Sequence, residues 1–322
     1  MNTKNTLPQK KVCGTLQNLP ENLAELLSSF SNHCVRKNLK KSSIAVYEKE
    51  VRWFLVLLAE QDCKNADSFE TDSIITACLG MSRPVYWTTI KTFLRYLCEA
   101  GYTAKDFSYV VPHYRRPEKI PSVYSVEEIR RIEVAISKPS LHNKRDLAAF
   151  MLASRLGLRA GDITTLTFDE LDFDLDRIEL KQDKTDIPLV LPLLSEIKEA
   201  LLDCIRTERP KTDSPYVFLN SLEPYGRMTV QGLDKYISAA MDRAGIVSGE
   251  RSRGVRAFRS SIASSMVNDG IPYEAVRRTL GHRDFNVIRH YAKLDIWQLR
   301  RYAVKPPEAT GQFARFLGGV RV

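Results

Sequence analysis

Four residues near the end of the chain combine side-chain types that could cleave a phosphodiester. Arg256, Arg259 and His282 carry permanent or potential positive charge, and Tyr291 follows them with a phenolic hydroxyl. Guanidinium groups bind phosphate oxygens through paired hydrogen bonds and stay charged at any physiological pH. A tyrosine oxygen can act as a nucleophile that forms a covalent intermediate. The types and order of these residues therefore suggest attack of the tyrosine on a phosphodiester.

Three short helices joined by tight turns could bring these side chains together. Apolar residues recur at helical spacing over 258–267, which places Arg259 near the start of a helix. A second predicted helix ends at Gly281, which suits the residue past a helix end and leaves His282 on the turn. The tyrosine then lies on a third helix. Taken singly, each residue has an ordinary explanation, because a lone Arg is usually solvated and a lone Tyr usually packs in a core.

The spacing of the set resembles the second conserved box of the tyrosine recombinase (phage integrase) family. That box reads His-x-x-Arg, then Leu-Gly-His with its His 23 residues after the Arg, then Tyr nine residues later. Here Arg259 and His282 are 23 positions apart, and Tyr291 follows nine positions after the histidine. One position departs from the pattern, since Arg256 takes the place of the family's first His.

An earlier segment resembles the first box of the same family. Gly-Leu-Arg-Ala-Gly-Asp follows a hydrophobic helix that closes at Gly157. Arg159 and Asp162 match the family's Arg and the acidic residue three positions later, with Asp in place of the commoner Glu. A buried guanidinium needs a carboxylate to hold it, so we expect Asp162 to support Arg159 from behind. Without the later box, an Arg-x-x-Asp pair would be an ordinary surface pair.

A predicted hairpin supplies a candidate proton donor. Residues 171–193 alternate apolar and polar side chains in the manner of strands, around the polar tip 181–186. The resemblance implies a mobile catalytic lysine at this tip, often before a Thr. Lys184 is the best match and Lys181 the alternative, although either could be an ordinary hairpin lysine.

The rest of the chain predicts two domains. Apolar stripes indicate four helices between 21 and 101, and the Pro-rich, basic stretch 113–121 indicates a linker. We therefore expect a mainly α fold with a small antiparallel β-sheet. The resemblance implies that the first domain is the family's SAM-like core-binding bundle and the second its catalytic domain. The expected boundaries are a flexible arm over 1–20, the bundle over 21–112, the linker over 113–123 and the catalytic domain with its tail over 124–322.

Composition narrows the class of protein. The 322 residues include 48 Lys and Arg against 39 Asp and Glu, a net charge of +9 that suits a polyanionic partner. We expect neither a membrane span nor a secretory signal. The six cysteines are scattered without a C-x-x-C motif, so we predict reduced, mostly buried thiols in a cytoplasmic protein, with neither a disulfide framework nor a metal site. The basic residues that we expect to contact DNA, rather than only to be solvated, are Lys40, Lys41, Lys91, Arg95, Arg115, Arg116 and Arg253.

The resemblance implies a full reaction. Tyr291 attacks the DNA backbone to form a 3′-phosphotyrosyl link, while Arg159 and Arg259 bind the nonbridging oxygens. His282 donates to the phosphate, and Lys184 protonates the leaving 5′ oxygen. The partner strand's hydroxyl then reverses the ester, so neither cofactor nor metal is required.

Arg256 changes one part of this scheme. Arginine can donate a hydrogen bond but cannot accept a proton, so it cannot replace His as a base. A phenol has an ordinary pKa of about 10. Our hypothesis is that the charge of Arg256 lowers the pKa of Tyr291 while water takes the proton. The alternative is that Arg256 only contacts backbone phosphate.

The expected partners follow from the resemblance as well. They are double-stranded DNA held in a clamp, three further copies in a homotetramer on paired sites, and accessory DNA-bending proteins. Two other functions remain open on the sequence. One is a type IB topoisomerase, which relaxes DNA without a partner site. The other is a DNA-binding regulator of the same fold that has lost catalysis.

Overall fold

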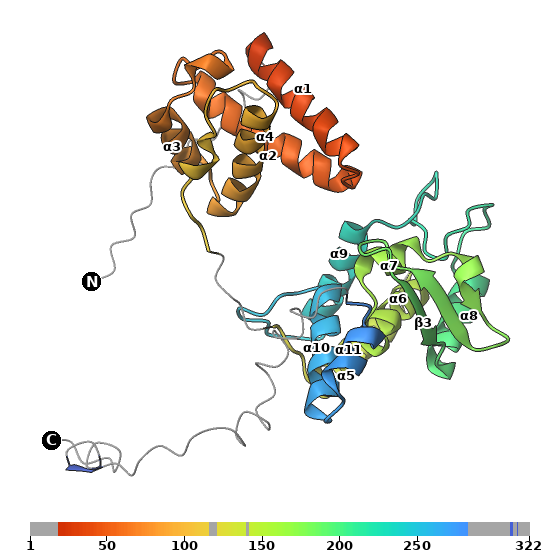
Figure 1. The fold of residues 1–322 in the computed structure, drawn as a ribbon. Helices are drawn as coiled ribbons and strands as arrows, with labels where there is room; N and C mark the ends of the chain where they lie inside the picture. Colours follow the sequence, from red (N-terminus) through yellow and green to blue (C-terminus); the bar gives the residue numbers. More distant parts are fainter. Residues whose placement is uncertain (1–18, 116–120, 140–141, 283–309, 312–313, 315–322) are drawn as a thin grey trace. The chain divides into compact units, whose positions relative to one another are not determined.

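The chain divides into two compact units in the computed structural model, Met1–Glu118 and Lys119–Val322 (Figure 1). The structure describes residues 19–115, 121–139, 142–282, 310–311 and 314. Tyr291 and Arg116 lie outside the described residues. Within the described part, no helix combines the length and the apolar character that crossing a membrane requires.

Four α-helices form the N-terminal unit around one core. They are α1 (Glu21–Arg36), α2 (Lys41–Ala59), α3 (Thr71–Gly80) and α4 (Trp87–Glu99). Aromatic rings from three of them meet at its centre. Phe93 lies edge-on to Phe30 at 5.2 Å between ring centroids and to Phe54 at 6.5 Å. All three are fully buried, and truncation of such a ring typically costs about 3–5 kcal/mol.

The C-terminal unit is built around a helix whose segment 147–153 is apolar on every side. This helix, α6 (Asn143–Arg155), buries the run from Ala148 to Ser154 and contacts helices on several sides. A helix of this character can only be stable inside a core. The helices around it are α5 (Val126–Ser137), α8 (Ser195–Thr207), α9 (Val230–Arg243) and α10 (Val255–Asn268).

A three-stranded antiparallel sheet covers one side of this unit. Its strands are β1 (Leu171–Asp172), β2 (Arg177–Lys181) and β3 (Pro188–Pro192), in the spatial order β1-β2-β3. Ile178 pairs with Leu191 and Leu180 with Leu189, and all four side chains face the core. The residues between them face outward, as the pleat requires. The predicted mainly α fold with a small antiparallel sheet is thereby confirmed.

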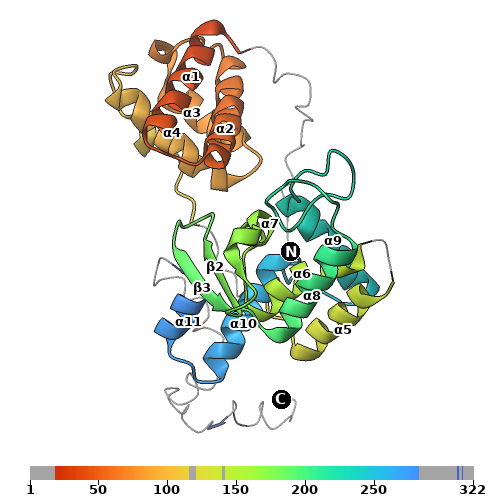
Figure 2. The same ribbon diagram turned by 90° about the vertical axis from the view of Figure 1, so that its right-hand side faces the viewer.

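Two short helices complete the part that concerns function. α7 (Ala160–Thr165) follows α6 after a turn at Gly157, and α11 (Tyr273–Thr279) follows α10 after a turn at Gly270. Both glycines have positive φ, the conformation that favours glycine past a helix end. A hydrogen bond from Gln182 to the carbonyl of Leu280 joins the β2–β3 hairpin to the end of α11 (Figure 2).

Candidate active site

Arg259 lies at the centre of the group of predicted catalytic residues. It is on α10 and only 6% exposed. Its Nη1 donates to the carbonyl of Gly157 at 2.7 Å, and its Nη2 donates to the carbonyl of Leu280. Its Nε donates to Nε2 of His282 at 3.3 Å. The guanidinium is therefore held in one plane by the turn before α7 and the turn after α11.

Arg159 reaches the same turn from the other side. It is the N-cap residue of α7, and its Nη2 donates to the carbonyl of Gly281 at 3.3 Å. Its Nη1 lies 3.8 Å from Oδ2 of Asp162, and one-fifth of the side chain is exposed. The two arginines, which are 100 positions apart in the chain, thus donate to consecutive carbonyls, those of Leu280 and Gly281.

Asp162 lies behind the arginines with its side chain almost fully buried. Its Oδ1 accepts a hydrogen bond from the backbone amide of Asp183 at 2.9 Å. Burial raises the pKa of Asp162, while that amide and the charges of Arg159 and Arg259 act in the opposite direction. The carboxylate links the first predicted box to the hairpin.

His282 is a neutral ring in this setting. Burial, and then the charges of Arg259, Arg159 and Arg277, lower the pKa of His282 to about 3. Because Nε2 accepts from Arg259, the proton of the neutral ring lies on Nδ1. Its backbone is fixed by Arg277, whose carbonyl accepts from His282 N at 3.0 Å and whose Nη1 donates to His282 O at 2.9 Å.

Two glycines allow these turns to approach their neighbours. Gly157 and Gly281 have φ values of +63° and +59°. A Cβ on Gly281 would lie 2.5 Å from the amide atoms of Gln182, and one on Gly157 would lie 2.9 Å from Cδ2 of Leu280. Any larger residue would therefore be both strained and too close to its neighbour.

Gln182 is a residue of this group that the sequence did not single out. It is completely buried, its Nε2 donates to the carbonyl of Leu280 at 3.2 Å, and its Oε1 accepts from Oγ1 of Thr185 at 2.7 Å. The signal was present in the strand alternation, since Ile178, Leu180 and Gln182 fall on the same, buried face. The prediction of a polar hairpin tip over 181–186 does not distinguish this position from its charged neighbours.

The remaining predicted residues lie around this group. Lys184 is exposed on the hairpin turn, and Lys181 is exposed with its Nζ 3.8 Å from Oδ1 of Asp186. Arg256 is exposed on the first turn of α10, one helical turn before Arg259. The structure thus brings Arg159, Asp162, Arg259 and His282 together around one turn, with Lys184 on the adjoining hairpin.

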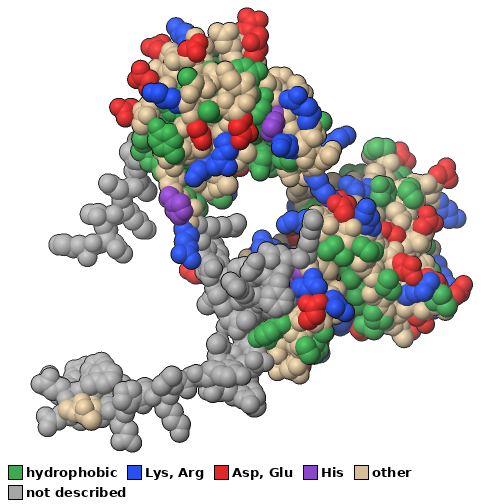
Figure 3. Space-filling model, in the orientation of Figure 1, with side chains coloured by type: hydrophobic (Ala, Val, Ile, Leu, Met, Phe, Trp, Pro, Cys, Tyr) green, Lys and Arg blue, Asp and Glu red, His purple; other side chains and the backbone are tan. Residues whose placement is uncertain are grey.

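The residues predicted to contact DNA are exposed wherever the structure describes them. Lys40, Lys41, Lys91 and Arg95 belong to the N-terminal unit, where Figure 3 shows several clusters of Lys and Arg side chains on the visible face. Arg115 is also exposed. Arg253 is exposed and already ion-paired, since its Nη2 lies 2.6 Å from Oδ1 of Asp242.

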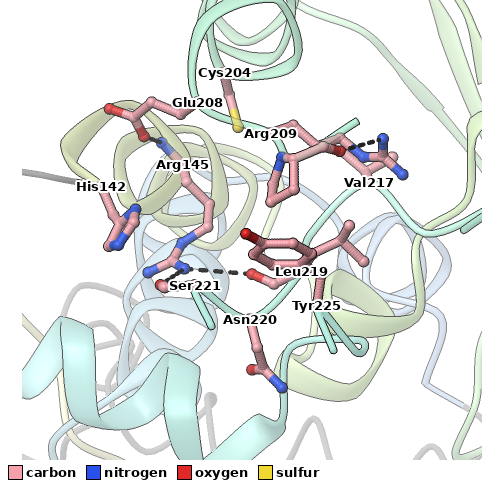
Figure 4. A pocket seen from close by; sticks show the side chains of 11 residues that line it. His142, Arg145, Cys204, Glu208, Arg209, Val217, Leu219, Asn220, Ser221 and Tyr225 are labelled. Atoms are coloured by element: carbon pink, nitrogen blue, oxygen red, sulfur yellow. Dashed lines mark hydrogen bonds between the residues drawn. The ribbon is translucent and has the colours of Figure 1, made fainter. Parts of the chain in front are cut away.

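The C-terminal unit also has a cavity of about 210 Å³, which is a different place from this cluster (Figure 4). Arg145 projects into it but is bound by protein groups, with Nη1 donating to Oγ of Ser221 at 2.7 Å and Nη2 to Oδ1 of Asp146 at 2.8 Å. The two carboxylate oxygens of Glu208 accept from the backbone amides at the start of α6. These contacts explain the buried charges as internal ties between α6, α8 and the following loop.

Known proteins resemble the chain in sequence and in fold. The model of the phage integrase family matches residues 123–296. A putative integrase/recombinase, y4rF of Sinorhizobium fredii, is 31% identical over 68% of this chain, which spans about half (52%) of that relative. The tyrosine recombinase XerD of Staphylococcus haemolyticus is 24% identical over 83% of this chain and 92% of its own. A lambda integrase tetramer bound to a Holliday junction shares the fold, with a TM-score of 0.61 at 15% identity over 81% of this chain and 77% of that one.

Proposed function

This chain belongs to the phage integrase family, and we propose that it is a site-specific tyrosine recombinase that cuts and rejoins DNA through a 3′-phosphotyrosyl intermediate. The observation that carries the proposal is the meeting of two arginines, from segments 100 residues apart, at the turn that bears His282. Integration, excision or transposition of a mobile element are the processes that such a reaction serves.

The contacts of the two arginines support a role in holding a phosphate. Backbone carbonyls orient both guanidinium groups before any DNA is bound, so little reorganisation is needed when charge develops on the phosphate. In the proposed reaction, Arg159 and Arg259 bind the nonbridging oxygens. Asp162 is proposed to hold the guanidinium of Arg159 in place, which is supported by its buried Oδ2 lying 3.8 Å from Nη1 of Arg159.

The proton transfers are assigned to other residues. The Tyr291 hydroxyl loses its proton to water and its oxygen forms a bond to phosphorus, the bond from phosphorus to the 5′ oxygen breaks, and Lys184 gives that oxygen a proton. His282 serves as a neutral hydrogen-bond donor to the phosphate rather than as a base, which its lowered pKa supports. Because the ester keeps the bond energy, the proposed reaction uses neither cofactor nor metal.

The proposed partners extend beyond the site. Double-stranded DNA is the substrate, and the exposed basic residues Lys40, Lys41, Lys91, Arg95, Arg115 and Arg253 are its proposed contacts, together with Arg116. A homotetramer on paired sites is supported by the fold that the chain shares with the tetrameric lambda integrase. Accessory DNA-bending proteins and action in the cytoplasm complete the proposal.

A covalent-capture experiment tests the reaction and finds its DNA target. Wild type is incubated with a library of nicked duplexes whose central sequence is randomised, so that a short fragment leaves after cleavage and traps the adduct. We expect the wild type to form a covalent adduct that survives denaturation and Tyr291→Phe to form none. Sequencing of the trapped DNA then identifies the target site.

Two results would contradict the proposal and identify another function. Tight binding without any adduct would make the chain a catalytically silent DNA-binding regulator. Relaxation of a supercoiled plasmid that lacks the captured sequence would make it a type IB topoisomerase.

A further inference from the structure

Gln182 occupies a position that connects the hairpin to the two arginines. We propose that it is a positioning residue, which holds the Lys184 turn against the turn that bears His282. The inference rests on the proposed recombinase function. It assigns to this buried amide the task of placing the proton donor relative to the phosphate-binding groups.

The backbone of Gln182 closes the turn that carries the lysine. Its amide donates to the carbonyl of Ile187 at 3.0 Å, and its carbonyl accepts from the amide of Asp186 at 2.9 Å. Residues 183–186 therefore form a tight loop between these two bonds. Lys184 lies within that loop, so its main chain can move only if the closure moves with it.

The side chain of Gln182 ties this loop to the end of α11. Nε2 donates to the carbonyl of Leu280, and Oε1 accepts from Thr185, the residue directly after Lys184. The carbonyl of Leu280 also accepts from Nη2 of Arg259. One backbone oxygen thus receives a donor from the hairpin and a donor from the central arginine.

A second bond fixes the loop on its other side. The amide of Asp183 donates to Asp162, and the carboxylate of Asp162 faces Arg159. The loop is consequently attached at one residue to the group around Arg259 and at the next to the group around Arg159. Two attachments at adjacent residues determine both the position and the direction of the lysine's backbone.

General acid catalysis contributes about 10²–10⁴-fold to a rate, and a misplacement of about 1 Å can forfeit much of it. Loss of the Gln182 amide should therefore slow strand cleavage by about 10- to 100-fold. A buried glutamine that only filled space would act differently. Its loss would lower stability and would affect every step that depends on folding to the same extent.

A change of the atom that leaves from phosphorus can distinguish a positioning role of Gln182 from a purely structural one. Gln182→Met keeps the length of the side chain but removes its donor and acceptor. Lys184→Ala is the reference for a lost proton donor. Gln61→Met is the control. Like Gln182, Gln61 in the N-terminal unit donates from Nε2 to the backbone, in its case to the carbonyls of Leu57 and Ser73.

Each variant is tested on the captured duplex with either oxygen or sulfur at the bridging 5′ position. A thiolate leaves without a proton, since a thiol has a pKa of about 8.5. We expect Gln182→Met and Lys184→Ala to cleave the oxygen duplex slowly and the sulfur duplex within a few-fold of wild type. Gln61→Met should match wild type on both. An equal loss of rate on both duplexes for Gln182→Met would overturn the proposal.

Hydrogen exchange provides a test that needs no DNA. In Gln182→Met, the amides of Asp183 and Asp186 should exchange at least tenfold faster than in wild type, and those of β1 should not change. Unchanged exchange at both amides would overturn the positioning role, even if the DNA assay worked. If wild type forms no adduct, the recombinase proposal fails by itself, and the exchange result still decides whether Gln182 holds the loop.

Discussion

At the scale of single residues, the neutral state of His282 has a consequence for stability. The unfolded chain has a histidine pKa near 6.5, whereas burial and three arginines lower the pKa of His282 to about 3 in the folded state. Below pH 6.5 the His282 ring binds a proton in the unfolded state but not in the folded state. The contribution of this residue is complete above pH 6.5 and falls by about 1.4 kcal/mol per pH unit as the pH drops toward 3.

Comparison with His282→Gln checks this prediction. The variant keeps a polar side chain but does not titrate. Hydrogen exchange of the α10 amides gives the opening free energy of each protein. Between pH 6.5 and 5.5, the opening free energy of wild type should fall by about 1 kcal/mol more than that of the variant. Parallel pH dependence in the two proteins would show that the ring is not held neutral.

The replacement of the family's first His by Arg256 gives a second prediction at this scale. Arg256 is exposed on the first turn of α10, and an arginine can donate a hydrogen bond but cannot accept a proton. Arg256→His should give adduct formation a new dependence on pH near 6.5, because histidine becomes a proton acceptor there. Single-turnover rates from pH 5.5 to 9 measure it. Arg243→His, at the exposed end of α9, is the control, and an unchanged rate and profile in Arg256→His would remove the pKa hypothesis.

At the scale of the elements, the turn after α11 depends on glycine for two separable reasons. Gly281 and Gly249 have similar φ values, +59° and +56°, but only Gly281 faces a neighbour that a Cβ would strike. Gly249→Ala should cost only backbone strain, about 1 kcal/mol. Gly281→Ala should cost about 2–4 kcal/mol and should displace Gln182, because a Cβ 2.5 Å from the amide cannot be accommodated.

Denaturant unfolding followed by far-ultraviolet circular dichroism measures both alanine variants. The same loss of stability in each would mean that strain alone explains Gly281. A crystal structure of the Gly281→Ala protein with an unmoved Gln182 would contradict the expected displacement.

The elements also show how far the sequence could predict the site. Helical spacing and the two boxes identified Arg159, Asp162, Arg259 and His282, which the structure places around one turn. The fold class followed from the same periodicities. Gln182 escaped because its neighbours Lys181, Asp183 and Lys184 are charged, which hid the alternation that continues from Ile178 and Leu180 and turns its side chain inward. The hydrogen bonds from the arginines to backbone carbonyls could not be predicted for a different reason. Every residue has a backbone carbonyl, so the sequence does not indicate which of them accepts.

At the scale of the whole molecule, the net charge of +9 predicts binding that weakens steeply with salt. The slope of log affinity against log salt is about −0.9 for each phosphate neutralised. Replacement of Lys91 and Arg95 together by Gln should make this slope less steep by the amount that two phosphate contacts contribute. Lys64→Gln is the control, because Lys64 is exposed in the same unit and lies 3.9 Å from the carboxylate of Asp62.

Fluorescence anisotropy with a labelled duplex at 50–300 mM NaCl measures these slopes. A double variant with the slope of wild type would mean that Lys91 and Arg95 are merely solvated. A change in Lys64→Gln half as large as that in the double variant would mean that only the overall charge matters, because the double variant loses two positive charges and Lys64→Gln loses one.

The carbonyl of Leu280 has one more implication, which concerns how this protein could be dissected. Every amino acid carries the same oxygen at that place, so no codon change at position 280 can delete the acceptor that joins Arg259 to Gln182. Mutational scans will detect the effects of its partners, Arg259 and Gln182, but cannot detect the contribution of the carbonyl itself. Chemical synthesis that exchanges the peptide link between residues 280 and 281 for an ester would weaken that oxygen while sparing every side chain.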